Sequence, residues 1–149
     1  MDTIQRLVLA VAAEQIGMGE EGGNNRGPVV AGYRNGLGKD GDPWCAAFVS
    51  WCYSEASGKL MRPMPFRYTL SARKLCRQLV PTEQPVPGDV VLWSRGAPWQ
   101  GHVGLYAERL DCSGFRTIEG NVGKYPSVVR EYTHELGEPR LIGFYRVRI

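Results

Sequence analysis

The most constraining feature of the sequence is one apolar stretch, Asp42-Pro43-Trp44-Cys45-Ala46-Ala47-Phe48-Val49-Ser50-Trp51-Cys52. Asp42 is a good N-cap residue, and Pro43 suits the first helical position because its missing N–H costs nothing there. The stretch therefore predicts the start of a helix. Its residues are apolar nearly all the way round, which is typical of a helix buried at the centre of a domain, and Gly58 is the expected end.

Cys45 falls in the first turn of this predicted helix. Unpaired backbone N–H groups and the positive end of the helix dipole favour a thiolate over a thiol at that place. Free cysteine is also among the most buried residue types. Cys45 is therefore either a nucleophile or one more small core residue, and the local sequence leaves both open.

Composition indicates one globular domain that spans residues 1–149. The net charge of +3 comes from scattered Lys and Arg residues, which does not fit a nucleic-acid binder. No stretch is long and apolar enough to predict a membrane span. Cys45 and Cys52 lie about 10 Å apart along one helix, too far for a disulfide. Free thiols are expected, although a bridge between Cys76 and Cys112 stays open.

The first residues predict an amphipathic helix. Leu7 to Ala13 resembles the core of a signal peptide, but the preceding residues carry no excess of positive charge. Apolar residues recur instead at helical spacing, at Ile4, Leu7, Val8, Val11 and Ile16. We expect a protein made in the bacterial cytoplasm without a signal peptide.

The rest of the chain predicts an α+β domain with N-terminal helices packed on one antiparallel sheet. Residues 17–41 are Gly-rich and irregular, with a short helix from Pro28. Their acidic and amide groups could hold calcium, but they lack EF-hand spacing, so turn chemistry is the expected role. A second amphipathic helix is predicted over residues 66–79. Strands are predicted at 90–93, 102–107, 115–119, 128–132 and 141–149.

Two of the predicted strands carry a histidine and a carboxylate. Alternation puts His102, Gly104 and Tyr106 on one face of the first strand, where Gly104 leaves room beside the histidine. Glu119 lies on the next strand. A turn at Leu110–Asp111 would set it directly across from His102, and a turn two residues later would shift the pairing by four. Either register lets the carboxylate orient the imidazole towards a nucleophile.

Four motifs in order resemble the CHAP domain (cysteine, histidine-dependent amidohydrolase/peptidase) of the NlpC/P60-like, papain-like superfamily. They are Trp44-Cys45-Ala46-Ala47-Phe48-Val49, Pro87-Gly88-Asp89-Val90-Val91, Gly101-His102-Val103-Gly104 and Glu119-Gly120-Asn121. The resemblance implies a papain-like fold with Cys45 as nucleophile, His102 as base, Glu119 as orienting acid and Asn121 as a fourth member. The Asn/Gly-rich lead-in before Cys45 resembles phage endolysins.

The resemblance also implies a peptidoglycan hydrolase, either an N-acetylmuramoyl-L-alanine amidase or an endopeptidase, working through an acyl-enzyme. The Cys45 backbone N–H would help to hold the oxyanion. Candidates for lining the substrate groove are Trp44, Trp93, Trp99 and Tyr106, with a core role as the alternative for Trp44 and Trp93.

A protein of this kind needs no cofactor, although a calcium requirement stays open. We expect a monomer whose partner is bacterial peptidoglycan, reached through a holin, a phage particle or a secretion system. Two other readings remain: a cell-wall-binding module with a degenerate site, and a metal-dependent hydrolase that uses Cys45, His102 and Glu119 as ligands. The second histidine, His134, lies among turn-forming residues and is expected to be exposed.

Overall fold

A computed structural model describes residues 3–148 of the chain. The helices within these residues are α1 (Thr3–Glu14), α2 (Pro28–Arg34), α3 (Cys45–Lys59) and α4 (Ala72–Arg77). The strands are β1 (Val80–Thr82), β2 (Val90–Ser94), β3 (Gly101–Arg109), β4 (Gly114–Glu119), β5 (Arg130–Glu135) and β6 (Leu141–Arg146).

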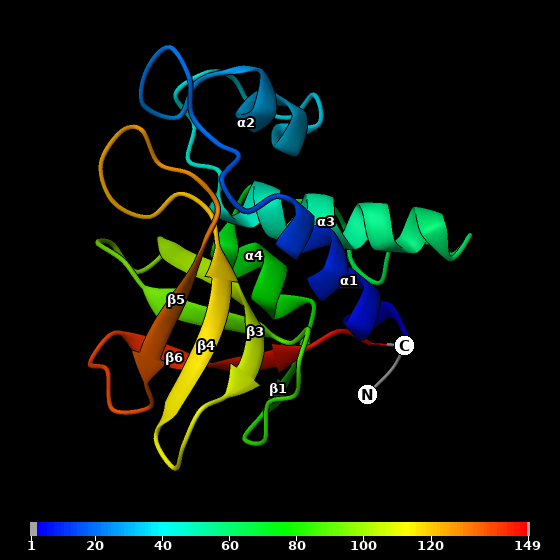
Figure 1. Ribbon diagram of the computed structural model, residues 1–149, viewed down its shortest axis with the longest axis vertical. Coiled ribbons are helices and arrows are strands. Elements are labelled where there is room, and N and C mark those ends of the chain that lie inside the picture. The colour runs from blue at the N-terminus through cyan, green and yellow to red at the C-terminus, as the bar shows by residue number, and fades with distance from the viewer. Residues whose placement is uncertain (1–2, 149) are drawn as a thin grey trace.

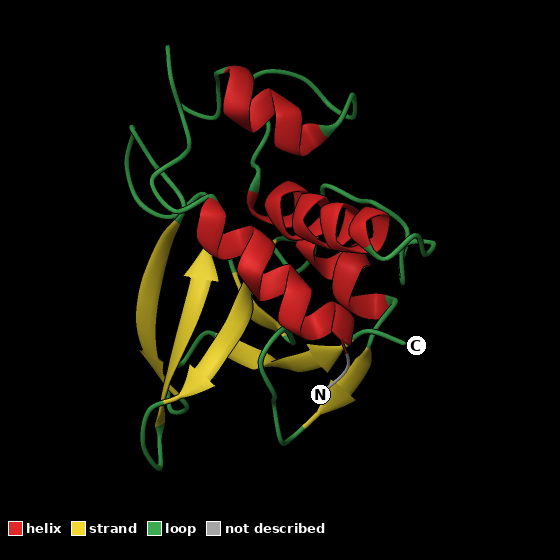
Figure 2. Ribbon diagram, turned by 45° about the vertical axis from the view of Figure 1, so that its right-hand side comes forward, coloured by secondary structure: helices red, strands yellow, loops and turns green. Residues whose placement is uncertain are grey.

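The strands form one antiparallel sheet in the order β1-β6-β2-β3-β4-β5. Helices α1, α3 and α4 pack on one side of this sheet, and α2 lies beyond them with the Gly-rich loops (Figures 1 and 2). The predicted α+β class is therefore confirmed. None of the described helices is long and apolar enough to cross a membrane.

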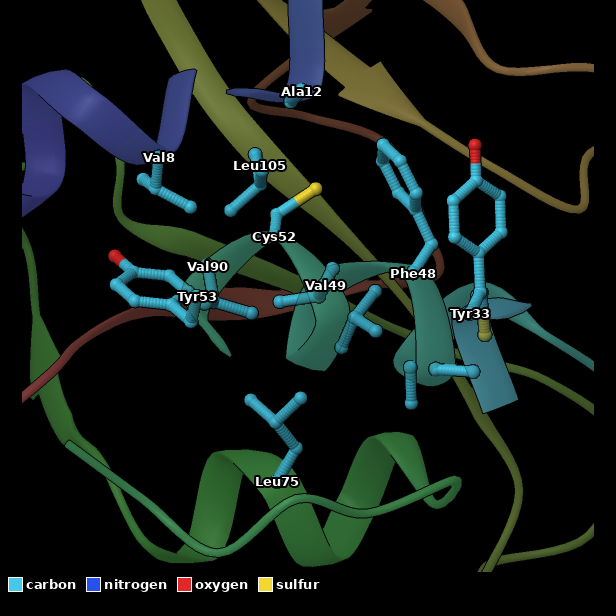
Figure 3. Close-up of a cluster of buried hydrophobic side chains, with 14 of the residues drawn as sticks. Val8, Ala12, Tyr33, Phe48, Val49, Cys52, Tyr53, Leu75, Val90 and Leu105 are labelled. Atoms are coloured by element: carbon cyan, nitrogen blue, oxygen red, sulfur yellow. The ribbon is translucent and has the colours of Figure 1, made fainter. Parts of the chain in front are cut away.

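Helix α3 occupies the centre of the core, as its all-round apolar sequence predicts. Phe48, Val49 and Cys52 are fully buried and point into a cluster that α1, α4 and the sheet also enter (Figure 3). The predicted cap is wrong: the helix begins at Cys45, and the Asp42 carboxylate instead accepts a hydrogen bond from the Lys39 N–H at 2.8 Å. Cys45 still occupies the first turn.

Two other predicted boundaries differ from the structure. Helix α4 covers only the second half of the predicted 66–79 segment, because the Ser71 hydroxyl caps it by accepting from the Lys74 N–H. The strand predicted at 128–132 is displaced to Arg130–Glu135. Strand β1 was not predicted, and its residues pair with the end of β6.

All four cysteines are free thiols, and Cys76 is buried whereas Cys112 is exposed. The disulfide that the sequence left open is therefore absent from the structure.

Candidate active site

Cys45 is the first residue of α3, and the N-terminal end of α3 lies beside the end of β4 (Figure 1). The preceding residue, Trp44, fixes this junction because its ring packs directly on Gly120, the residue after β4. A side chain at Gly120 would collide with that ring. The start of α3 and the end of β4 are thus held together by an aromatic ring against bare backbone.

Buried Glu20 ties the loops around this junction to α3. Its carboxylate accepts hydrogen bonds from the Trp44 indole N–H at 3.0 Å, the Asn25 N–H at 2.9 Å and the Ser127 N–H at 2.8 Å. These donors occupy the carboxylate oxygens of Glu20, which is one of the acidic groups of residues 17–41 considered above as calcium ligands. Among residues 3–148 no group of three or more His, Cys, Asp or Glu side chains is arranged to hold a metal ion.

Strands β3 and β4 divide their side chains between the two faces of the sheet as alternation predicts. Val103 and Leu105 enter the helix-covered core, whereas His102 and Glu119 lie on the opposite face. The register matches neither predicted turn, because Leu105 pairs with Ile118 and a bulge follows Tyr106. A bulge of this kind reconciles a turn at Gly114 with a histidine close to the acid.

Gly104 provides the space that this pair requires. A Cβ atom at residue 104 would overlap the Glu119 side chain. Because Gly104 has none, the Glu119 carboxylate can lie across the strand and reach the His102 ring. The sequence prediction that Gly104 leaves room beside the histidine is confirmed.

The His102 ring links the carboxylate to the thiol. Its Nε2 atom lies 2.7 Å from Glu119 Oε1, and both side chains are buried. The Nδ1 atom is buried and makes no hydrogen bond of good geometry with the other described residues. The Cys45 thiol interacts with this ring. Catalytic hydrogen bonds are commonly long before substrate binds. The three side chains therefore form a chain in the order Cys45, His102, Glu119.

The electrostatics of the chain favour a charged pair. Burial alone would raise the pKa of Cys45, but the His102 ring, the Val103 N–H and the charge of Arg95 together lower it below its ordinary value. Burial alone would lower the pKa of His102, and its contacts with Cys45 and Glu119 raise it to about 9. A thiolate–imidazolium pair is thus favoured over two neutral groups.

The other buried thiols provide an internal comparison. Burial raises the pKa of Cys52 well above its ordinary value, and raises that of Cys76 to about 12. Cys45 is buried as well, yet its pKa moves in the opposite direction. Among these three buried thiols, only Cys45 is prepared for ionisation.

A second histidine shares the same carboxylate, which the sequence analysis missed. His134 was expected to be exposed, but it lies on β5 with its side chain 18% exposed, and its Nε2 is 2.6 Å from Glu119 Oε2. Its Nδ1 is 2.9 Å from Glu138 Oε2. Burial lowers the pKa of His134, but hydrogen bonds and charge from the two carboxylates raise it overall. The sequence signal that could have placed His134 on a strand is the alternation Glu131-Tyr132-Thr133-His134-Glu135, which puts Tyr132 and His134 on one face.

Glu119 is consequently held on both oxygens. His102 approaches Oε1, while His134 and the Thr117 hydroxyl approach Oε2. Burial would raise the pKa of Glu119, but these donors lower it to about 2. Because an ionised carboxylate can only accept hydrogen bonds, both imidazole Nε2 atoms carry a proton.

Asn121, the fourth predicted catalytic residue, lies two positions beyond Glu119. It is partly buried with a left-handed φ of 63°. Its side chain makes no hydrogen bond within the described part of the chain. In this structure Glu119, and not Asn121, makes the contact with His102.

The four candidate groove residues have different environments. Trp44 is fully buried, so the prediction that it lines a groove is wrong. Trp93 lines a hollow of about 420 Å³ together with His102, and its ring is 5.5 Å from the histidine ring. Trp99 is 73% exposed and borders a hollow of about 180 Å³ beside Cys45.

Tyr106 is also wrong as a groove residue. It is buried in a second apolar cluster on the sheet face opposite the helices, against Phe115 and Phe144. The hollow that it borders is a different one, lined neither by Cys45 nor by His102.

Comparison with known proteins agrees with this geometry. No curated protein sequence matches the chain. Residues 37–121 match the CHAP domain family, and this segment is more than half of the chain. It begins before α3 and ends just after β4, so it contains Cys45, His102 and Glu119. The chain therefore belongs to the CHAP domain family.

Proposed function

We propose that this protein is a cysteine hydrolase of peptidoglycan, an N-acetylmuramoyl-L-alanine amidase or an endopeptidase with a papain-like arrangement. CHAP domains are in general hydrolytic amidase or peptidase domains, and membership suggests a peptidoglycan substrate. One observation carries the proposal: a buried cysteine at a helix N-terminus contacts a histidine that is fixed by a buried carboxylate. That arrangement is the requirement for an activated thiol nucleophile.

In the proposed mechanism the Cys45 thiolate attacks the carbon of an amide carbonyl. The backbone N–H groups at the start of α3 face the oxyanion that forms, and the helix dipole favours it. His102 then gives a proton to the departing amine as the C–N bond breaks, which leaves an acyl group on the sulfur. In the second step His102 accepts a proton from water and the hydroxide attacks the thioester carbon. The C–S bond then breaks, which releases the acyl fragment as a carboxylic acid and restores the Cys45 thiolate beside protonated His102.

Glu119 acts through His102. Its acceptor-only carboxylate keeps the proton on Nε2, so that Nδ1 is the nitrogen turned towards the thiol. It also favours the imidazolium that forms during the reaction. Asn121 is retained as a fourth member of the proposed site because it follows in the same motif, Glu119-Gly120-Asn121.

The two other readings receive less support. In a metal-dependent hydrolase Glu119 would be a ligand, but both of its oxygens are already hydrogen-bonded by imidazoles. A binding module with a degenerate site does not account for the lowered pKa of one buried thiol among three. The Gly-rich segment ahead of α3 supports a phage lysin as the first candidate class and a secreted antibacterial effector as the second.

The proposal is tested by digesting purified peptidoglycan of several wall chemotypes and analysing the fragments by mass spectrometry. We expect fragments with wild-type protein and none with Cys45→Ala. The matched control is Cys112→Ala, which removes an exposed thiol in the turn after β3, at the opposite end of that strand from His102. Free lactyl carboxyl groups on muramic acid would identify an amidase, and new peptide termini an endopeptidase. Activity that survives in Cys45→Ala but disappears with a chelator would contradict the proposal.

A further inference from the structure

Two hollows border the Cys45–His102 pair, one lined by each residue. The smaller, of about 180 Å³, is lined by Cys45 and Trp99. The larger, of about 420 Å³, is lined by His102 and Trp93. Arg95 lines both hollows and therefore stands at their junction. The two hollows therefore adjoin at Arg95, with Cys45 on the lining of one and His102 on the lining of the other.

The chemistry of acyl transfer assigns a different part of the substrate to each hollow. The acyl group becomes bonded to the Cys45 sulfur, so it must lie on the cysteine side. The amine departs with a proton from His102, so it must lie on the histidine side. The larger hollow is therefore the side of the leaving group. This assignment rests on the proposed function.

Two arginines stand on the rim of the larger hollow. Arg95 follows β2 directly, and Arg140 precedes β6. The Ser94 N–H donates to the Arg140 carbonyl at 2.8 Å, which holds the two chain segments together. Both arginines are exposed, and neither side chain forms an ion pair or hydrogen bond with another of residues 3–148.

The carboxylates of this hollow do not neutralise the arginines. Glu119 accepts from His102 and His134, as described above. Glu138 accepts from the Trp93 indole N–H at 3.0 Å and from His134. The rim thus presents two unpaired positive charges above a floor whose negative charges are already paired. The charge of Arg95 also reaches the reactive sulfur, because it contributes to lowering the pKa of Cys45.

We propose that the larger hollow is the leaving-group subsite, and that Arg95 and Arg140 bind a carboxylate carried by the departing amine. The leaving group would then be an amino acid or peptide with a free carboxylate close to the bond that is cut. Guanidinium groups suit this task because their planar donors match the two oxygens of a carboxylate.

The first test compares two substrates that differ in one group. The muropeptide that the protein cuts is prepared with the leaving residue's carboxylate free, and again as the carboxamide. We expect wild-type protein to favour the acid by about tenfold in kcat/KM, as charge-assisted hydrogen bonds do. Arg95→Gln and Arg140→Gln should each lose most of this preference. Arg6→Gln, which removes an exposed charge on α1, should keep it.

A second test needs no peptidoglycan. Cys45 is alkylated with iodoacetate, which is an anion, and with iodoacetamide, which is neutral and nearly the same size. Because both reagents respond equally to the fraction of thiolate, the ratio of their rates reports only the local attraction for anions. We expect the ratio to fall about threefold in Arg95→Gln at low salt and to stay unchanged in Arg6→Gln.

The two tests separate this inference from the proposed function. If the iodoacetate-to-iodoacetamide rate ratio falls in Arg95→Gln while no peptidoglycan is cut, the anion subsite is supported and peptidoglycan is contradicted as the substrate. Cleavage by wild-type protein with equal kcat/KM for acid and carboxamide would overturn the subsite and leave the hydrolase intact. An unchanged preference in both arginine variants would overturn it as well.

Discussion

Glu119→Gln should show how much the carboxylate contributes by orienting and charging His102, because the substitution leaves the nucleophile Cys45 in place. The pKa of Glu119 is lowered from 4.5 to about 2, which corresponds to about 3 kcal/mol in favour of the carboxylate. By linkage, the groups that lower this pKa are favoured in return by the same total free energy. The carboxylate therefore favours the protonated forms of His102 and His134. An amide of the same shape removes this charge.

The amide also changes which ring nitrogen carries the proton. Gln at residue 119 can present an NH₂ group to His102 Nε2, which would then have to accept. The proton would move to Nδ1, the nitrogen turned towards Cys45, where it cannot take a proton from the thiol. We therefore expect Glu119→Gln to lower kcat by about 10²- to 10⁴-fold with little change in KM.

The assay combines turnover with the pH dependence of Cys45 alkylation by iodoacetamide. In wild-type protein the alkylation should persist well below the pH at which an unperturbed thiol ionises. In Glu119→Gln its midpoint should move to higher pH, because His102⁺ is no longer favoured beside the thiolate. Glu83→Gln, which removes an exposed carboxylate that lines neither hollow beside Cys45 and His102, is the matched control. A wild-type kcat and an unmoved alkylation midpoint in Glu119→Gln would refute this reasoning.

Four further outcomes are expected. His134→Ala should lower kcat about threefold to tenfold, and His134→Gln should recover part of it by donating to the same Glu119 oxygen; equal effects of the two variants would contradict this role. Gly104→Ala should lower the free energy of unfolding by about 2 kcal/mol in urea titrations and reduce activity, because the new Cβ would overlap Glu119. In the control Gly137→Ala the new Cβ meets no neighbour, so the free energy of unfolding should change by less than about 0.5 kcal/mol. The rate of acylation should fall as pH rises through about 9, where His102 loses its proton; a fall near pH 6.5 instead would contradict the raised pKa of His102. The stability contributed by ionised Glu119 should be complete above pH 4.5 and be lost as pH falls through about 2. Urea titrations of wild-type protein and Glu119→Gln between pH 6 and pH 2 would measure this as a loss of stability in the wild-type protein that the variant does not share.

The faces of the central strands could be predicted from the sequence alone, because strand alternation has a fixed period of two. That period placed Val103 and Leu105 in the helix-covered core and His102 on the other face, and the structure agrees. The register could not be predicted. It depends on the bulge after Tyr106, which no local residue pattern specifies.

The role of His134 was out of reach for a related reason. In the β4–β5 register it lies opposite Phe115, two same-face positions along β4 from Glu119. The two side chains meet because both reach over Thr117, whose hydroxyl joins the same carboxylate oxygen. A sequence can show that residues share a face, but contacts along a face depend on side-chain direction.

Trp44 shows a different limit: its place next to Cys45 predicts a substrate contact, but the residue is fully buried. An aromatic residue beside Cys45 fits a groove wall or a core anchor equally well by composition. Two residues from distant parts of the chain place Trp44 in the core. Glu20 accepts a hydrogen bond from its indole N–H, and its ring packs on Gly120. The N-cap prediction at Asp42 failed for a local reason, because its carboxylate accepts from the Lys39 N–H within the preceding loop instead of capping α3.

The central claim is that Cys45 carries the acyl group during turnover. The most direct measurement is acid quenching of the protein with its muropeptide substrate within the first turnover, followed by digestion and mass spectrometry of the Cys45 peptide. The account predicts a transient thioester on Cys45 whose mass equals the acyl fragment, and no cleavage by protein alkylated at that residue. Continued cleavage by protein alkylated at Cys45, with no adduct on its peptide at any time, would contradict it.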